Sequence, residues 1–370
     1  MFVETLIYSY LVICGAMIIF NIICIFVFQK RDQNLAARSK RFTKEIEAQV
    51  TNLNENADIS ETHRKMLKNK LTKINYLMAF DETLDTMHQD HPEIVRKYIY
   101  AISPVFVYLT LEYRKKSKLK AAYFPYIIKK YGVYRKQDIS IVSNIMLDLV
   151  QDSNLYCREN ALQALYAIGD AEYVVKALKI IDESAYFHNP KLLSDGLLNF
   201  KGDKKLLDEK LWQLYPSCSL QMQITLLNYF RFSSGEHCEK MLALMTRSGQ
   251  NQEICLACIR YFGKYHYAPA FPYLLKFAEN DRGEQWEYAA IAALSLEKYP
   301  CDQTLEILKK LLKNPFWYVR YNASQSIKSM NVQYEDLMDI FEGQDRYAGE
   351  MLRYRMDQRK MEREAAERSE

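Results

Sequence analysis

The sequence predicts an all-α protein in which a single transmembrane helix is followed by an α-solenoid, a right-handed superhelix of stacked helix pairs. Three observations indicate this fold class. First, 11 glycines and 9 prolines make only 20 of 370 residues, whereas sandwiches, barrels and propellers need a turn about every 8–12 residues. Second, one long run near the N-terminus carries no charge. Third, apolar helical patterns recur at a regular interval in the second half. With 49% hydrophobic residues, the chain can bury a core and is not disordered.

Residues 1–31 form the first predicted element, a membrane anchor. The 24 residues Thr5–Phe28 contain no charged side chain. A helix of this length extends about 36 Å, enough to cross about 30 Å of hydrocarbon. A secretory signal peptide would have a basic start, a shorter apolar run and a small-residue cleavage site. Here the run ends in Phe-Gln-Lys-Arg at 28–31, so we expect residues 5–28 to remain as an uncleaved span.

The charges beside the span predict its orientation. Glu4 is the one charged side chain before it, whereas six cations follow within about 16 residues: Lys30, Arg31, Arg38, Lys40, Arg41 and Lys44. Because positively charged flanks stay on the cytoplasmic side, we expect a single-pass plasma-membrane protein with its N-terminus outside and its solenoid in the cytoplasm. Eight cysteines at spacings that suggest no disulfide framework fit that compartment.

Residues 32–90 are expected to be a helical juxtamembrane connector of one or two helices. Ser60 is the expected N-cap of a helix, because a serine hydroxyl can accept from the unpaired amides of the first turn. Apolar residues follow Ser60 at helical spacing.

The second half of the chain repeats itself. Residues 156–161 and 318–323 both read Tyr-x-Arg-x-Asn-Ala, and weaker copies lie between them. A small residue marks the centre of each copy, at Ala161, Ser194, Thr225, Ala257, Ala289 and Ala323. The steps between these positions are 31 to 34 residues, a period typical of solenoids. A second amphipathic helix lies in each period, so neighbouring pairs are expected to stack into one core.

The copy at Tyr156–Asp170 resembles a HEAT repeat of the short bacterial type, whose consensus includes Val-Arg-x-x-Ala-x-x-Ala-Leu-x-x-Ile-Gly-Asp. The copy at 313–330 is also similar, with Val319 and Arg320 inside its helix. The resemblance implies a HEAT-like solenoid over residues 91–344 and a macromolecule-binding role. Residues 345–370, with seven basic and seven acidic side chains, are expected to form a charged helical tail.

Motifs for enzymatic chemistry are missing from the sequence. It contains no glycine-rich dinucleotide or phosphate loop, no Gly-x-Ser-x-Gly and no His-Glu-x-x-His. His88 and His91 lie near Asp85, and Cys255 pairs with Cys258 at a CxxC spacing, but neither set has the further ligands that a metal site requires. We therefore predict a protein without catalytic residues, cofactor or metal.

The segment 111–136 is the most basic part of the chain, with nine cations against one acid and interleaved tyrosines. Such a segment is either a solvated helix face packed by its tyrosines or a contact with anionic lipid or an acidic partner. Nucleic acid is the less favoured ligand, because the rest of the solenoid is acidic. The residues predicted to face a membrane or other anionic surface are Lys30, Arg31, Arg114, Lys115, Lys116, Lys118, Lys120, Lys129 and Lys130.

A protein partner is expected on the helix that carries the arginine of each repeat. Polar residues between its apolar positions would line the concave groove and suit an extended peptide or a helix. These residues are Asn160, Gln163, Tyr166, Asn228, Arg231, Arg260, Asn322 and Gln325. The alternative is that Asn160 and Asn322 serve the fold by capping turns between repeats.

The function these features favour is a membrane-anchored cytoplasmic scaffold or adaptor that binds a membrane-associated protein. It could belong to a membrane-bound complex such as a glycosyltransferase system. Two alternatives stay open. One is a tether that holds nucleic acid or anionic lipid through 111–136, and the other is an enzyme of HEAT-like form, of lyase or glycosylase type, for which no convergent acids and bases are visible.

Overall fold

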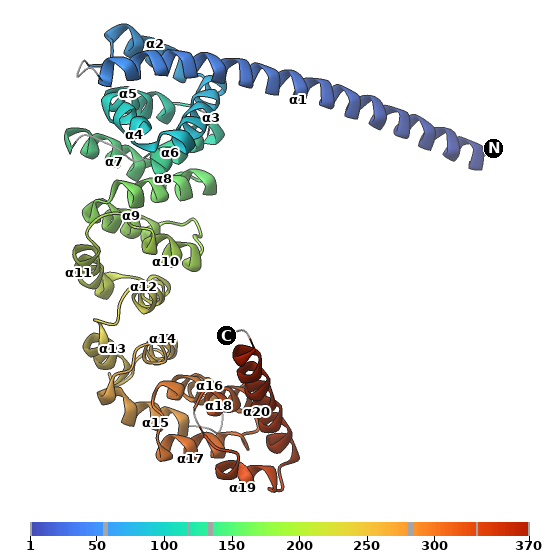
Figure 1. Ribbon diagram of the computed structural model, residues 1–370, viewed down its shortest axis with the longest axis vertical. Helices are drawn as coiled ribbons and strands as arrows, with labels where there is room; N and C mark the ends of the chain where they lie inside the picture. The colour runs from blue at the N-terminus through green and yellow to red at the C-terminus, as the bar shows by residue number, and fades with distance from the viewer. Residues whose placement is uncertain are drawn as a thin grey trace. The chain divides into compact units, whose positions relative to one another are not determined.

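The computed structural model describes residues 2–54, 58–116, 118–131, 136–279, 285–330 and 332–368. These residues form twenty α-helices and four short 3₁₀ helices, and no strand occurs among them. The all-α class predicted from the sequence is confirmed. The chain, whose helices are labelled in Figure 1, divides into two compact units. Unit 1 comprises residues 1–188 and 199–210, and unit 2 comprises residues 189–198 and 211–370.

Unit 1 contains α1 (Phe2–Asn54), α2 (Glu61–Leu71), α3 (Ile74–Asp90), α4 (Pro92–Ala101), α5 (Ser103–Arg114), α6 (Lys118–Tyr131), α7 (Lys136–Val150), α8 (Leu155–Ile168), α9 (Ala171–Glu183) and most of α11 (Lys204–Leu214). Unit 2 contains α10 (Pro190–Leu198), α12 (Leu220–Ser233), α13 (Cys238–Met245), α14 (Gln252–Phe262), α15 (Phe271–Glu279), α16 (Trp286–Ser295), α17 (Asp302–Leu311), α18 (Trp317–Ser329), α19 (Met338–Phe341) and α20 (Arg346–Glu367).

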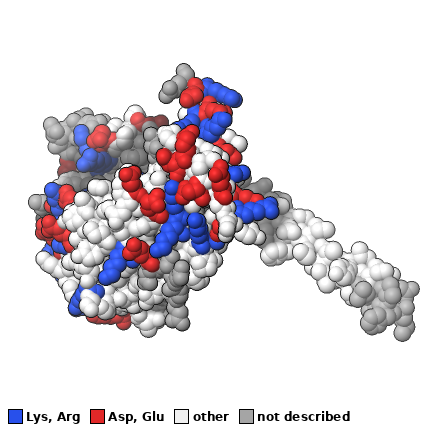
Figure 2. All heavy atoms as spheres, turned by 90° about the horizontal axis from the view of Figure 1, so that it is seen from below, with Lys and Arg blue, Asp and Glu red and all other residues white. Residues whose placement is uncertain are grey.

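Helix α1 is continuous over 53 residues and has two different halves. The first half projects from unit 1 (Figure 1), and its apolar side chains are exposed, with Phe20 at 66% and Phe26 at 68%. The second half is packed, with Phe42 at 2% and Ile46 at 1% exposure. The projecting half is long and apolar enough to cross a membrane, a property shared by membrane anchors and signal sequences. Where the projecting part is described, Figure 2 shows it free of charged side chains.

The pair α4–α5, bent by 66°, is the other described segment that is apolar and long enough to span. Its side chains, however, belong to the core of unit 1. Tyr98 and Leu109 are fully buried, and the Tyr98 hydroxyl lies 2.7 Å from His63 Nε2 of α2. The hydroxyl of Tyr113 donates to the carbonyl of Leu71 at 2.7 Å. These hydrogen bonds to α2 place α4 and α5 inside the folded unit.

The connector predicted at 32–90 packs as part of unit 1. Helix α1 crosses α3 where the Phe42 and Phe80 rings stand 5.5 Å apart, and Ser39 Oγ lies 3.0 Å from Thr83 Oγ1 beside them. The predicted N-cap is confirmed: Ser60 accepts from the backbone N–H of His63. No helix break occurs at residue 31, because α1 runs through it.

Helix pairs stack within each unit. In unit 1, α6 packs on α8 and α7 on α9. In unit 2, α10, α12, α14, α16, α18 and α20 each pack on the next in that order, and α15 packs on α17. All six small residues that mark the repeats are buried, at 5% exposure or less. Their size lets successive helices of one layer approach, so the predicted repeat is confirmed as a packing period.

One close approach in unit 1 joins two neighbouring turns. Gly169 ends α8 in the left-handed region at φ +78°, which glycine adopts without steric cost. A Cβ at Gly202 would lie 2.0 Å from the Gly169 carbonyl oxygen. The Tyr166 carbonyl accepts from the N–H of Lys201 at 3.0 Å. Both glycines are therefore required by this contact.

Candidate functional site

The two arginines of the repeated motif hold loops together. Arg158 Nη1 donates to the carbonyl of Asp152 at 2.9 Å, and Arg320 Nε donates to the carbonyl of Asn314. Each carbonyl lies six residues before its arginine. The other end of each guanidinium reaches the following repeat, where Arg158 Nη2 donates to the Phe187 carbonyl at 3.0 Å and Arg320 pairs with a carboxylate described below. These arginines therefore stabilise the fold.

The two asparagines of the motif also make one shared contact. Asn160 Nδ2 donates to the Ala122 carbonyl of α6 at 2.9 Å, and Asn322 Nδ2 donates to the Ala290 carbonyl of α16 at 2.7 Å. Each amide thus joins its helix to the preceding helix of the same layer. The structural alternative fits these residues better than the groove does, although they bind helix carbonyls and do not cap turns.

Three further residues predicted for the groove have different surroundings. Tyr166 is 1% exposed, so the prediction that it projects into a groove is wrong. Gln163 donates to Glu159 at 2.9 Å, and His188 Nε2 lies 3.0 Å from the same carboxylate. Burial opposes the charged form of Glu159, but these hydrogen bonds outweigh it and lower its pKa. Gln325 is partly buried, and its Oε1 has no hydrogen-bond partner in the described structure.

Helices α12 and α14 bring the remaining three together on one surface of unit 2. Arg231 and Arg260 are partly exposed, as is Asn228. Burial and the nearby charge of Arg260 lower the pKa of Arg231. Arg231 lies over the Phe232 ring at 4.5 Å, and Lys264 lies over the same ring at 4.9 Å. We call Arg231, Phe232, Arg260 and Lys264 the α12–α14 cationic surface.

The charges of the α12–α14 cationic surface are not compensated by the carboxylates that the structure describes. Within the described part of the chain, neither Arg231 nor Arg260 forms an ion pair with a carboxylate. Phe232 is 46% exposed between Arg231 and Lys264. Guanidinium groups bind carboxylates through two parallel hydrogen bonds, so this surface is chemically suited to an acidic partner segment.

Three cations of the basic segment 111–136 pair with carboxylates in unit 1: Arg114, Lys115 and Lys130. Arg114 Nη2 lies 2.8 Å from Asp148, Lys115 lies 3.0 Å from Glu112, and Lys116 lies over the Tyr113 ring at 5.9 Å. Lys120 and Lys129 are exposed. The side chain of Lys118 falls outside the described residues, as do residues 132–135 and the side chain of Lys136.

Lys130, also predicted to face an anionic surface, belongs to a partly buried network between α3 and α6. Lys130 Nζ lies 2.7 Å from Asp81 and also pairs with Asp85. The hydroxyls of Tyr131 and Tyr123 donate to Asp81 at 2.7 and 2.9 Å. Burial opposes the charge on Lys130, yet the two carboxylates outweigh it and raise its pKa. Lys130 is thus a partly buried ion-pair partner of Asp81 and Asp85, which corrects its prediction as a cation that faces an anionic surface.

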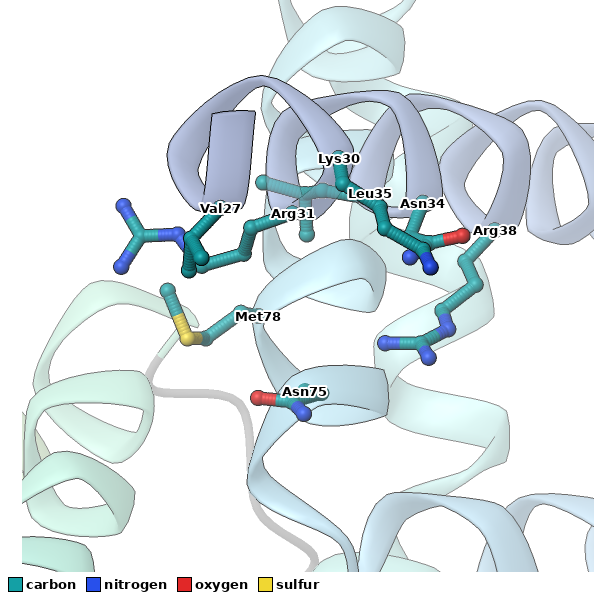
Figure 3. A pocket seen from close by; sticks show the side chains of 8 residues that line it. All are labelled: Val27, Lys30, Arg31, Asn34, Leu35, Arg38, Asn75 and Met78. Atoms are coloured by element: carbon teal, nitrogen blue, oxygen red, sulfur yellow. The ribbon is translucent and has the colours of Figure 1, made fainter. Parts of the chain in front are cut away.

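A polar pocket lies between α1 and α3, and the sequence predicts only part of its lining. Figure 3 shows its lining: Val27, Lys30, Arg31, Asn34, Leu35 and Arg38 from α1, with Asn75 and Met78 from α3. Its volume is about 350 Å³. Lys30 and Arg31 had been predicted to face an anionic surface. The other residues could not be grouped with them, because no repeat pattern reveals that α1 crosses α3.

Exposed aromatic side chains form a second feature that the sequence reasoning missed. Trp317 and Tyr318 at the start of α18 are 55% and 60% exposed. Trp286 of α16 stacks on the Tyr318 ring at 6.0 Å, and Tyr321 lies against Trp317 at 4.8 Å. The available signal was two adjacent aromatic residues just before the repeat's arginine.

The described residues offer no metal centre: no group of three or more His, Cys, Asp or Glu side chains is placed to hold an ion. Cys258 is buried and burial raises its pKa, so its thiol is poorly suited to redox or ligand chemistry.

Comparison with protein-family models gives no match, and comparison with curated proteins gives none. Among solved structures, the chain is similar to human deoxyhypusine hydroxylase in complex with glycerol, at 12% identity over 81% of this chain and 97% of that chain. The TM-score is 0.28, which is too low to assign a fold, a family or an activity.

Proposed function

We propose that this protein is a membrane-anchored scaffold of the HEAT-like type, which binds an acidic segment of a membrane-associated protein. The observation that carries the proposal is the two-part character of α1. Its apolar half projects fully exposed, while its second half is part of the core of unit 1. Exposing so much apolar area to water is unfavourable, and a bilayer removes that cost.

The orientation in this proposal is N-terminus outside and all residues after the span in the cytoplasm. Six cations follow the span within about 16 residues, and cationic flanks stay on the cytoplasmic side. The helix continues unbroken from the span into unit 1, so the span would hold that unit at the membrane surface. Confinement of this kind raises the effective concentration of the scaffold for membrane-bound partners.

The partner surface in this proposal is the α12–α14 cationic surface. Arg231 and Arg260 are partly buried and have no carboxylate partner among the described residues. An acidic segment would neutralise these two guanidiniums. Exposed Phe232 adds apolar area between the charges. Arg and aromatic residues are enriched among those that dominate binding energy. A membrane-bound multiprotein system such as a glycosyltransferase complex is the class of partner we favour.

Labelling with a membrane-impermeant maleimide tests the anchor and its orientation. Native Cys301 is exposed and reports on unit 2, and a Val3→Cys variant reports on the N-terminus. We expect labelling of V3C in intact cells and of Cys301 only after permeabilisation. Intact mass should include residues 1–31. Labelling of Cys301 in intact cells, or loss of the N-terminal segment, contradicts the proposal.

Partner recovery from membranes tests the binding surface. We expect R231Q/R260Q to recover less of the acidic partner than wild type does. The control K310Q/K313Q removes two exposed cations from the α17 region of the same unit and should leave recovery unchanged. Equal recovery by all three proteins would exclude the α12–α14 cationic surface.

A further inference from the structure

The pocket between α1 and α3 lies where the apolar half of α1 ends. Val27 belongs to the charge-free run, and Lys30 and Arg31 follow it within one helical turn. At 1.5 Å per residue, they lie about 3–5 Å beyond Phe28. The polar layer on each side of a bilayer is roughly 5–8 Å thick. In the proposed membrane orientation, these two cations therefore lie at the depth of lipid phosphates.

The pocket combines apolar side chains with cationic and amide side chains, as the upper part of a phospholipid requires. Val27 and Leu35 offer apolar contact at the α1 wall, and Met78 does so from α3. Asn34 and Arg38 reach from α1 towards Asn75 of α3 (Figure 3). Arg38 is about 15 Å beyond Phe28 by backbone rise, but helical side chains point back towards the N-terminus. Its guanidinium therefore lies closer to the membrane than its backbone does.

The charge of the pocket is positive, and carboxylates of the described residues compensate little of it. Of its eight lining residues, three are cationic and none is acidic. Arg31 Nε lies 3.8 Å from Asp32, but both side chains are about two-thirds exposed, where such pairs contribute little. Arg38 lies over the Tyr76 ring at 4.7 Å, and neither it nor Lys30 forms an ion pair within the described residues.

From this geometry we propose that the α1–α3 pocket binds the headgroup of one anionic glycerophospholipid of the cytoplasmic leaflet. Lys30 and Arg31 contact the phosphate. Asn34, Arg38 and Asn75 hydrogen-bond the polar end of the headgroup, and Met78 contacts the glycerol and upper acyl carbons. A zwitterionic lipid is disfavoured because its terminal cation would meet Arg38. The inference rests on the proposed span but not on the proposed partner.

Native mass spectrometry of the full-length protein tests this site. Protein purified in detergent is mixed with equal amounts of phosphatidylglycerol and phosphatidylcholine. The mass of the protein–lipid complex then identifies the retained lipid. Wild type should retain one phosphatidylglycerol. R31Q/R38Q should lose about thirtyfold in affinity, since each cation near an anionic surface contributes roughly fivefold. Retention of both lipids equally by wild type, or no retention, overturns the proposal.

A matched control separates a pocket from general attraction. K40Q/K44Q removes the same charge from exposed positions that do not line the pocket. These residues lie about 18 and 24 Å beyond Phe28, farther than a Debye length of about 8 Å. The control should retain phosphatidylglycerol as wild type does. Equal loss in both double variants would overturn the proposal.

A third variant and a competitor complete the test. N75D places a carboxylate in the first turn of α3, where an acidic residue is favourable to the helix, and should abolish retention without removing a cation. Excess inorganic phosphate should not displace the lipid. Displacement would indicate a soluble phosphate ligand in place of a lipid. Partner recovery through Arg231 and Arg260 is measured separately, so failure of one proposal is distinguishable from failure of the other.

Discussion

Arg320 of α18 and Asp345, the N-cap of α20, face each other in a bidentate pair. Arg320 Nη1 and Nη2 donate to Asp345 Oδ1 and Oδ2 at 3.1 and 2.8 Å. The same carboxylate accepts from the backbone N–H of Ala348 at 3.0 Å. One aspartate thus caps the charged C-terminal helix and fixes it to the last helix of the repeats, where Leu352 and Met356 are buried.

Replacing Asp345 should make unfolding less dependent on acid. The hydrogen bond from Arg320 is the main reason that the pKa of Asp345 is lowered. Because the folded pKa lies below the unfolded value near 4, the pair stabilises the protein above that value and its contribution disappears as pH falls through the folded pKa. We expect D345N to cost about 1.5 kcal/mol at pH 7 and progressively less as pH falls through the folded pKa of Asp345.

Urea unfolding at several pH values measures this difference. Asparagine is as good an N-cap as aspartate, so D345N removes the charge and keeps the cap. D345A also removes the cap and should cost about 1 kcal/mol more at every pH. A cost of D345N that is the same at pH 7 and at pH 2 would show that the ion pair contributes nothing.

Asn322→Ala should destabilise unit 2 without altering partner recovery. The substitution removes the hydrogen bond from Asn322 to the Ala290 carbonyl, which keeps its bond within α16. The net loss of one such hydrogen bond costs about 1 kcal/mol. Chemical unfolding checks the stability and affinity purification from membranes checks the partner. Gln325→Ala is the control on the same helix, since its Oε1 has no hydrogen-bond partner in the described structure. Lost recovery in N322A at unchanged stability would restore Asn322 to the binding surface.

Gly202→Ala should destabilise unit 1 by about 3 kcal/mol, because its Cβ would meet the Gly169 carbonyl and force the two turns apart. The comparison is Gly249→Ala. Gly249 also has a positive φ, of 69°, but a Cβ there meets nothing within 4 Å, so only the backbone penalty of about 1 kcal/mol applies. Thermal unfolding of both variants shows whether the steric contact of the Cβ at Gly202 or the positive φ at Gly249 costs more stability.

Local and periodic features were predictable from the sequence. Contacts between helices that share no repeat pattern were not. Ser60 and the six small repeat residues needed only neighbouring sequence or a fixed period. Asp81 meets Lys130 across 49 residues with no repeat to align them. Tyr166 was misplaced because α8 packs against α6, α7 and α9, so most of its circumference is buried. A prediction that assigns one apolar stripe to a helix with three neighbours underestimates how many of its side chains are buried.

Lys130→Met should lower the free energy of unfolding more than the same substitution at its exposed neighbour Lys129. Removing Lys130 leaves Asp81, which is 7% exposed, without its ion-pair partner, and breaking a buried pair costs about 3 kcal/mol. Lys129→Met removes an adjacent exposed cation and should stay within about 0.5 kcal/mol of wild type. Equal stabilities in urea would mean that the tyrosine hydroxyls alone satisfy Asp81.

Arg260→Gln should weaken partner binding while leaving stability unchanged or slightly raised. Burial is the larger cause of the lowered pKa of Arg231, and the like charge of nearby Arg260 lowers it further. Removing that repulsion favours the folded state, by no more than about 0.5 kcal/mol at a surface. The same guanidinium is expected to bind a partner carboxylate, and losing such a contact costs about tenfold in Kd. Thermal unfolding and quantitative recovery from membranes measure the two effects on one variant. If Arg260 served the fold, R260Q would lose both stability and binding. A destabilised R260Q, or an R260Q that binds the partner normally, would contradict the prediction. Either result would mean that the α12–α14 cationic surface is structural and does not bind the acidic partner.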